Sequence, residues 1–211
     1  MTMLYRLDAT AAEVAAHFGA RQGDDPWAGG YIAPGQFAPI VTSGREEIAG
    51  PRPKGDSLRR LVPRLWGVPP PAPAGDPGRG VTTVRNPDSP FWIGNLRNSE
   101  FRCLVPATAF MEWGPKSQER GRDAQGKRPR HWIALADQPL FAMAGVWKDS
   151  EVASFALVTC EANAALRALG CERMPAILPA GPAARHVWLN GEWQRAAALL
   201  APYSSSLTLV G

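Results

Sequence analysis

The pattern of hydrophobic and polar positions along the chain predicts many short strands separated by few helices. The strand-like segments are rich in apolar, aromatic and β-branched residues over lengths that strands adopt. They are Phe37–Val41, Leu61–Trp66, Val81–Arg85, Cys103–Ala107, Ala109–Trp113, Trp132–Ala136, Leu140–Trp147, Ser154–Cys160 and Met174–Leu178. Because few helical segments lie between them, we expect an α+β domain with a mixed, largely antiparallel sheet.

Helical signals are confined to three places in the sequence, namely residues 9–20, 161–169 and 182–199. In the first of them Thr10 can cap the helix, and Glu13 three residues later completes a capping box. These segments provide a few helices that flank the sheet.

Two loops stand out between the strands. Residues 67–80 contain five prolines and four glycines, which exclude a helix or a central strand. Residues 114–131 connect two strands as a long hairpin would. No composition shift divides the 211 residues convincingly, and we therefore expect one domain over residues 1–211.

The positive net charge of the chain is concentrated in one loop. The net charge is +4, and residues 114–131 hold six basic and two acidic residues, which give +4 alone. The remaining 17 basic and 17 acidic residues balance. The basic character therefore reflects one loop and does not by itself indicate a nucleic-acid partner.

Composition also excludes several classes of protein. Three scattered cysteines do not make a disulfide framework, and three histidines far apart make a zinc site a poor expectation. No apolar run is long enough to span a bilayer, and the first residues lack the apolar region of a signal peptide. We expect a cytoplasmic, monomeric protein with no metal, cofactor or membrane partner.

A few side chains are candidates for chemistry on the pattern alone. Glu112 lies between Met111 and Trp113, where desolvation would raise its pKa and suit it to general acid work. The alternative is a strand carboxylate that faces solvent while its neighbours face inward. Arg85 ends an apolar strand and could reach a phosphate or form a surface salt bridge. Trp66 could stack on a base or pack in the core.

Several segments together resemble the SRAP family, the SOS response-associated peptidases, also called abasic-site-processing proteins. The start Met-Thr-Met-Leu-Tyr resembles the family's Met-Cys-Asn-Leu-Tyr opening, and Leu65-Trp66-Gly67 resembles its tryptophan–glycine motif. The most specific signature runs from Arg102-Cys103-Leu104-Val105-Pro106 to Phe110-Met111-Glu112-Trp113. Further similar segments are Pro34–Val41, Thr83–Trp92 and Leu157–Leu178. They occur in the family's order over residues 1 to about 190.

The resemblance implies a role in the response to DNA damage. Family members capture abasic sites in single-stranded DNA with a cysteine that becomes the N-terminus after methionine removal. Its amine forms a Schiff base with the open-chain aldehyde, and its thiol closes the adduct into a thiazolidine. An asparagine, a glutamate and a histidine assist, and arginines bind flanking phosphates. The same cysteine is thought to process the protein's own N-terminus, which explains the peptidase name.

This sequence departs from the family at the positions that carry the chemistry. Thr2 stands at the cysteine, Thr83 at the asparagine and Cys171 at the histidine, whereas Glu112 is retained. The resemblance further assigns phosphate contacts to Arg85 and Arg173, and Trp66 is the candidate for a DNA contact by stacking. A hydroxyl is a weaker nucleophile than a thiolate, and its oxazolidine should hydrolyse more readily than a thiazolidine.

Two functions follow from these departures. The first is sensing of abasic sites in single-stranded DNA with weakened or lost covalent cross-linking, so that lyase-type or peptidase activity is left open. The second is a catalytically inactive SRAP scaffold that serves as a protein-interaction module. Cys171 is either a relocated nucleophile or a small buried filler.

Overall fold

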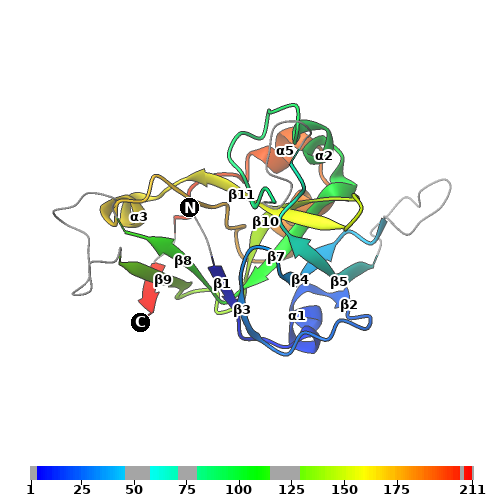
Figure 1. Ribbon diagram of the computed structural model, residues 1–211, viewed down its shortest axis with the longest axis horizontal. Helices are drawn as coiled ribbons and strands as arrows, with labels where there is room; N and C mark the ends of the chain where they lie inside the picture. Colours follow the sequence, from blue (N-terminus) through cyan, green and yellow to red (C-terminus); the bar gives the residue numbers. More distant parts are fainter. Residues whose placement is uncertain (1–3, 46–57, 71–79, 115–128, 205–206, 211) are drawn as a thin grey trace.

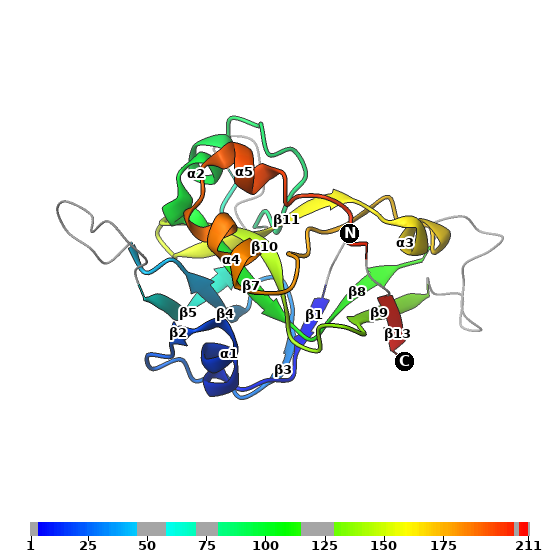
Figure 2. The same ribbon diagram turned by 180° about the vertical axis from the view of Figure 1, so that it is seen from behind.

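The chain builds two sheets that share one continuous central segment (Figures 1 and 2). The computed structural model describes residues 4–45, 58–70, 80–114, 129–204 and 207–210. The first sheet has the strand order β13-β9-β8-β1-β3, with β1 Leu4–Leu7, β3 Gly30–Ile32, β8 Ala109–Trp113, β9 Arg130–Leu135 and β13 Leu207–Val210. Its pairs are antiparallel.

The second sheet has the order β12-β11-β10-β7-β4-β5-β2, and β6 pairs with β11 beside this path. Its strands are β2 Ala20–Arg21, β4 Phe37–Thr42, β5 Arg59–Trp66, β6 Thr83–Val84, β7 Arg102–Ala107, β10 Phe141–Lys148, β11 Ser154–Glu161 and β12 Arg173–Pro175. Strand β5 also pairs in parallel with β11, through Leu65 with Ser154 and Trp66 with Phe155. Strands β5, β4, β7, β10 and β11 therefore close into a ring.

Helices flank the two sheets. They are α1 Ala11–Phe18, α2 Ile93–Arg97, α3 Ala164–Ala168, α4 Pro182–Asn190 and α5 Trp193–Ala197, with the 3-10 turn η2 Ser99–Phe101 before β7. Figure 2 shows α4 in front of β7, and Trp188 of α4 donates its indole N–H to the carbonyl of Cys103 at 2.8 Å. Helix α4 thus covers the outer side of β7.

Strands β7 and β8 form one extended segment that passes from the second sheet to the first at Thr108. The Thr108 backbone N–H donates to the carbonyl of Arg6 at 2.7 Å, and its hydroxyl donates to the same carbonyl at 3.0 Å. The N–H of Asp8 donates to the Thr108 hydroxyl at 3.2 Å. This corner ties the N-terminal strand to the centre of the fold.

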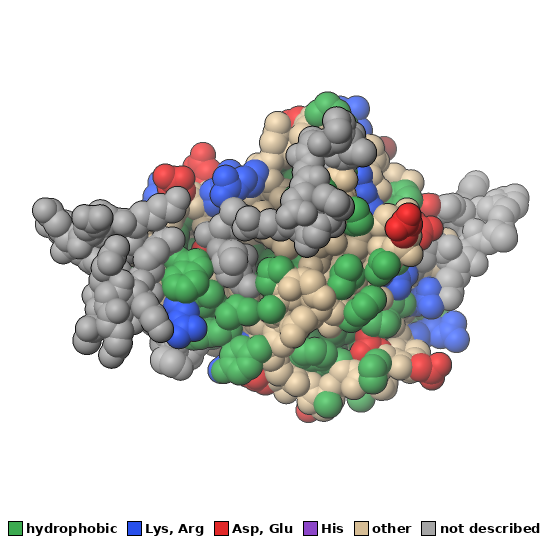
Figure 3. Space-filling view, viewed as in Figure 1, with side chains coloured by type: hydrophobic (Ala, Val, Ile, Leu, Met, Phe, Trp, Pro, Cys, Tyr) green, Lys and Arg blue, Asp and Glu red, His purple; other side chains and the backbone are tan. Residues whose placement is uncertain are grey.

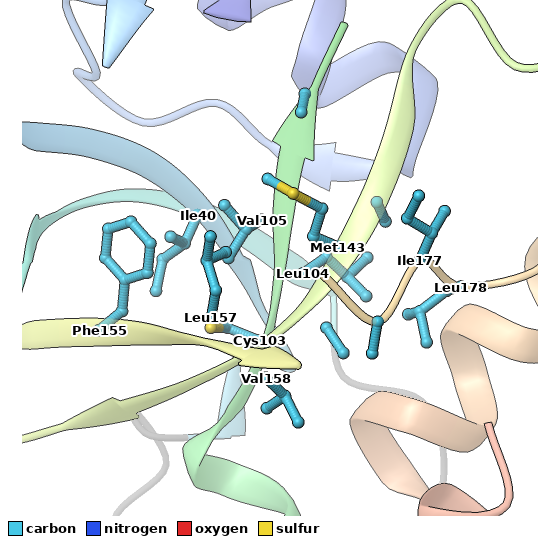
Figure 4. Packing of buried hydrophobic residues seen from close by; sticks show 14 of the residues in the cluster. Ile40, Cys103, Leu104, Val105, Met143, Phe155, Leu157, Val158, Ile177 and Leu178 are labelled. Atoms are coloured by element: carbon cyan, nitrogen blue, oxygen red, sulfur yellow. The ribbon is translucent and has the colours of Figure 1, made fainter. Parts of the chain in front are cut away.

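The core fills the inside of the ring and continues onto buried side chains of the first sheet. Figure 4 shows side chains of β4, β7, β10 and β11 converging there, among them Ile40, Val105, Met143, Phe155 and Leu157. Every residue of β7 is buried because one side faces the ring interior and the other meets α4. This explains why β7 is a continuous apolar run rather than an alternating one.

Most sequence predictions of elements are confirmed. The fold is α+β with mixed, mostly antiparallel sheet, and the capping box of Thr10 and Glu13 starts α1. The predicted segments at Phe37–Val41, Leu61–Trp66 and Ser154–Cys160 are strands within a residue or two of their predicted bounds. The strands that flank residues 114–131 pair as a hairpin, while residues 115–128 lie outside the described residues. Residues 71–79 of the proline-rich loop also lie outside them.

Other predictions were too long or missed elements. The expected strand Val81–Arg85 is only Thr83–Val84, since β6 pairs with β11 over two residues and Asn86-Pro87 then turns the chain. The expected strand Met174–Leu178 ends at Pro175, followed by a bridge from Ile177 to Met143. Helix α3 begins late because Asn163 is its cap, accepting the N–H of Leu166 at 3.0 Å. Elements β1, β2, β3, β13 and α2 were not predicted, being short segments that their tertiary partners stabilise.

Gly145 of β10 gives a direct test of packing inside the ring. A Cβ there would lie 2.7 Å from Cγ2 of Val105 and 2.8 Å from Sγ of Cys103, both on β7. We expect Gly145→Ala to lower the free energy of unfolding by about 1–3 kcal/mol, since overpacking displaces β7. Urea denaturation followed by tryptophan fluorescence measures this.

Gly94→Ala is the matched control. No atom lies within 4 Å of a Cβ built at Gly94, which is in helix α2, so that alanine should be neutral or slightly stabilising. Equal unfolding midpoints for the Gly145→Ala variant and the native protein would contradict the packing described here.

Candidate functional site

Glu112 occupies a buried position on β8. Its side chain has no exposed surface, and the expectation of a solvent-facing carboxylate is therefore wrong. In the antiparallel register Glu112 stands directly opposite His131 of β9. Directly opposite residues bring their Cβ atoms within about 4.5–5.5 Å, so a carboxyl and an imidazole share one site.

Nothing in the sequence pattern distinguishes His131, which falls at the end of the basic loop. Its pairing with Glu112 depends on the register of the β8–β9 hairpin, and a long loop does not fix that register. Gly114 lies against this imidazole, because a Cβ built on Gly114 would be 3.2 Å from Nε2 of His131. The glycine that follows Trp113 thus leaves space for the ring.

The N-terminal strand reaches this same site. Leu4 pairs with Met111, and Tyr5 pairs with Phe110. Since the strands are antiparallel, the N-terminal end of β1 lies at the end of β8 that carries Glu112. Thr2, the predicted counterpart of the family cysteine, lies outside the described residues.

Thr83 and Arg85 are positioned by the short strand β6. Thr83 is 8% exposed and lies next to Leu157 of β11 in the parallel register. The hydroxyl of Thr159 donates to the carbonyl of Val84 at 2.8 Å, which fixes the end of β6. Arg85 follows with an exposed side chain, and the described residues provide no carboxylate in an ion pair with it. Its guanidinium is therefore available to an anion in solution.

Arg173 on β12 holds this segment in place. Its Nε donates to the hydroxyl of Thr159 at 3.0 Å, and its Nη2 donates to the carbonyl of Thr159 at 2.6 Å. Nη2 also donates to the carbonyl of Arg85 at 3.1 Å. Because these bonds join β6, β11 and β12, Arg173 positions Arg85 as well as contributing positive charge itself.

Cys171 connects the two parts of the site. Its side chain is 7% exposed, and its Sγ donates to the carbonyl of Trp113 at 3.5 Å. Cys171 therefore contacts Trp113, the residue that follows Glu112. In the sequence Cys171 is also only two positions before Arg173. The predicted positions form two neighbouring groups, one around Glu112 and one around Thr83 and Arg85. The burial of Cys171 fits a small core side chain better than an accessible nucleophile.

Trp66 belongs to the core. It has no exposed surface, its ring lies edge-on to Tyr5 at 5.1 Å, and its indole N–H donates to the carbonyl of Thr82 at 3.0 Å. This is the packing role that the sequence allowed as an alternative to base stacking. By holding Thr82, Trp66 helps to place the following residue, Thr83.

Exposed aromatic surface lies instead on Tyr31 and Phe37, which are 60% and 57% exposed. Tyr31 of β3 contacts Trp132 of β9, with ring centroids 5.4 Å apart. Figure 3 shows hydrophobic side chains gathered over the lower centre of the face that is also seen in Figure 1. The sequence did not indicate these residues because a lone tyrosine beside two glycines has no distinctive pattern.

The described residues contain no group of three or more histidine, cysteine or acidic side chains that could hold a metal ion. None of the helices among them is long and apolar enough to cross a bilayer. Burial is the largest effect on the Cys160 thiol and raises its pKa to about 11, so Cys160 is a poor nucleophile at neutral pH.

Replacement of Arg173 tests its positioning role. We expect Arg173→Gln to lower the free energy of unfolding by about 1–3 kcal/mol, because it removes the donors that join β6, β11 and β12. Urea denaturation measures the change. Arg195→Gln on the exposed surface of α5 is the control and should stay within about 0.5 kcal/mol of the native protein. Equal free energies of unfolding for the two variants would contradict the positioning role of Arg173.

Comparison with solved structures places this fold among known ones. A protein from Bacteroides thetaiotaomicron has a TM-score of 0.70 and 19% identity, over 99% of this chain and 92% of that chain. A Bordetella bronchiseptica protein has a TM-score of 0.68 and 18% identity over 99% of both chains. A phage-related protein from the same organism has a TM-score of 0.65 and 18% identity, over 99% and 93% of the two chains.

No curated protein matches the sequence. Residues 1–210 match the family described as SOS response associated peptidase (SRAP). The match spans both sheets, the buried Glu112 strand and the β6–β12 segment that holds Arg85. The chain therefore belongs to the SOS response associated peptidase family.

Proposed function

We propose that this protein binds single-stranded DNA and senses abasic sites in it, with weaker or shorter-lived covalent capture than a cysteine would give. The observation that carries the proposal is the register of β1 on β8, with Leu4 opposite Met111. This register sets the first residue of β1 beside the strand that carries the buried carboxyl of Glu112. An abasic site offers an aldehyde, and a chain-terminal amine is the group that condenses with it.

Thr2 precedes Leu4, the first residue of β1, by two positions in the sequence. Once Met1 is removed, the unprotonated amine of Thr2 attacks the aldehyde carbon; α-amines ordinarily have pKa values of about 8. The carbinolamine then loses water and becomes a Schiff base. The hydroxyl of Thr2 can close this imine to an oxazolidine, which reopens more easily than a thiazolidine.

In this proposal Glu112 supplies the proton for the departing water. Its burial suits a carboxyl to general acid work. Thr83 and Cys171 occupy the sequence positions where the family has an asparagine and a histidine. Neither can shuttle a proton as an imidazole does. His131 opposite Glu112 is an imidazole that could serve the same site from another strand.

Arg85 binds a phosphate of the DNA strand in this proposal. Its side chain is exposed, and Arg173 holds its backbone against β11 and β12. The exposed rings of Tyr31 and Phe37 suit stacking with unpaired bases. If DNA binding is absent, the remaining function is that of an inactive SRAP scaffold acting as a protein-interaction module.

Charge reversal at Arg85 tests the phosphate contact. We expect Arg85→Glu to weaken binding to a short single-stranded oligonucleotide about tenfold at low salt. The slope of the logarithm of the binding constant against the logarithm of the salt concentration should become shallower by about one. Fluorescence anisotropy over a series of salt concentrations measures both. Arg195→Glu on α5 carries the same charge change and should bind nearly as the native protein does. Equal losses in both variants would assign the effect to net charge alone.

The covalent chemistry is tested with oligonucleotides that contain one abasic site. For the native protein without its Met1, we expect a mass increase by intact mass spectrometry only when borohydride reduces the imine. Thr2→Cys should form a durable adduct without borohydride, because its thiol closes the imine to a thiazolidine. The measurement also reports whether Met1 is removed.

Undamaged oligonucleotide of the same sequence is the control for this reaction. A durable adduct with the native protein would contradict the weakened capture proposed here. Absence of any adduct with Thr2→Cys, in protein shown to lack Met1, would contradict a competent site around Glu112. Retention of DNA binding in that case would leave a noncovalent sensor.

A further inference from the structure

A second cluster of polar side chains lies at the other end of the central segment, away from Glu112. Arg102 is the first residue of β7, and its side chain has no exposed surface. Its Nη2 donates to the carbonyl of Gly191, and its guanidinium lies 5.7 Å from the ring of Trp188. Nε and Nη1 are buried without a hydrogen-bond partner.

Arg45, which follows β4, adds a second guanidinium to this cluster. Its Nη1 donates to the hydroxyl of Ser99 at 3.4 Å, and its Nη2 donates to the side-chain oxygen of Asn190. These contacts join the end of β4 to η2 and α4. Arg45, Ser99 and Asn190 are each partly exposed, so the cluster is open to solvent on their side.

Neither guanidinium forms an ion pair with a carboxylate among the described residues. Burial, with a smaller contribution from the charge of Arg45, lowers the pKa of Arg102 to about 10. Arg102 therefore stays charged at neutral pH. A buried charge with donors left unpaired is costly, and proteins compensate such charges with an ion of opposite sign.

We propose that Arg102 and Arg45 form a binding site for a small phosphate, either inorganic phosphate or the terminal phosphate of a phosphomonoester. The two guanidiniums supply two positive charges to match the dianion, and Nε and Nη1 of Arg102 supply unused donors. Guanidiniums are the side chains best suited to phosphate oxygens. Ser99 and Asn190, both partly exposed, line the solvent side of the cluster.

This site is separate from the proposed abasic-site chemistry. Arg102 and Glu112 lie at opposite ends of the segment formed by β7 and β8, in different sheets. The phosphate site depends on η2, α4 and the end of β4, whereas the candidate DNA site depends on β6, β8 and β12. Failure of one proposal therefore leaves the other standing.

Thermal unfolding in sodium phosphate, compared with sodium chloride at equal ionic strength, tests the site. We expect phosphate at ten times its dissociation constant to raise the Tm by about 3–6 °C, in a saturable manner. Arg45→Gln should abolish this rise. Arg102→Met should abolish it too, while circular dichroism shows that its fold is retained. Arg195→Gln on α5 is the matched control and should keep the full rise.

Absence of a saturable rise in the native protein would overturn the proposal. So would an equal rise in Arg45→Gln, since the effect would then come from general salt exclusion or another site. A single-stranded oligonucleotide added at saturating phosphate distinguishes the source of the anion. If it displaces the phosphate, the site binds a backbone phosphodiester of DNA and the proposal is overturned; if it does not, the ligand is a small phosphate as proposed.

Discussion

The fold depends on one extended segment, Arg102–Trp113, that crosses from one sheet to the other and is buried almost throughout. Inside the ring it pairs with β10 and contacts β4, and beyond Thr108 it pairs with β1 and β9. The corner is fixed because Thr108 donates twice to the carbonyl of Arg6. A shift of this segment by one residue would reverse which side chains face each core, so both sheets depend on its register.

The same segment carries a charged or titratable side chain at each end, and each has become the centre of a candidate site. Glu112 is buried beside the N-terminal strand and opposite His131, which suits proton transfer. Arg102 is buried beside Arg45, which suits an anion. Buried ionisable groups cost folding free energy, and their presence on the most constrained strand pair is consistent with functional roles. Arg173 acts differently, since its guanidinium donates to backbone and hydroxyl oxygens within the protein and thereby positions the backbone of Arg85.

Sequence reasoning selected Glu112 and Arg85 as candidates from their neighbours, and the family resemblance added Thr83, Cys171 and Arg173. It could not choose between the two uses of Trp66, because an indole is equally compatible with a core and a surface until its neighbours are known. His131 was missed since its place opposite Glu112 depends on hairpin register. The pairing of Arg102 with Arg45 was missed because the two residues are far apart in sequence and meet only when β4 and β7 are adjacent. Charge counting pointed to residues 114–131 instead.

The sequence by itself determined the α+β class, the main strands, the capping of α1 and membership of the SOS response associated peptidase family. These follow from local periodicity, capping chemistry and motif order, which need no knowledge of distant contacts. Only the tertiary structure decided that Glu112 is buried, that Trp66 lies in the core, and that Arg173 holds Arg85. It also decided the short strands such as β1 and β6. Burial and strand pairing are properties of residues distant in sequence, so the physical environment of a side chain is fixed only when the sheets close around it.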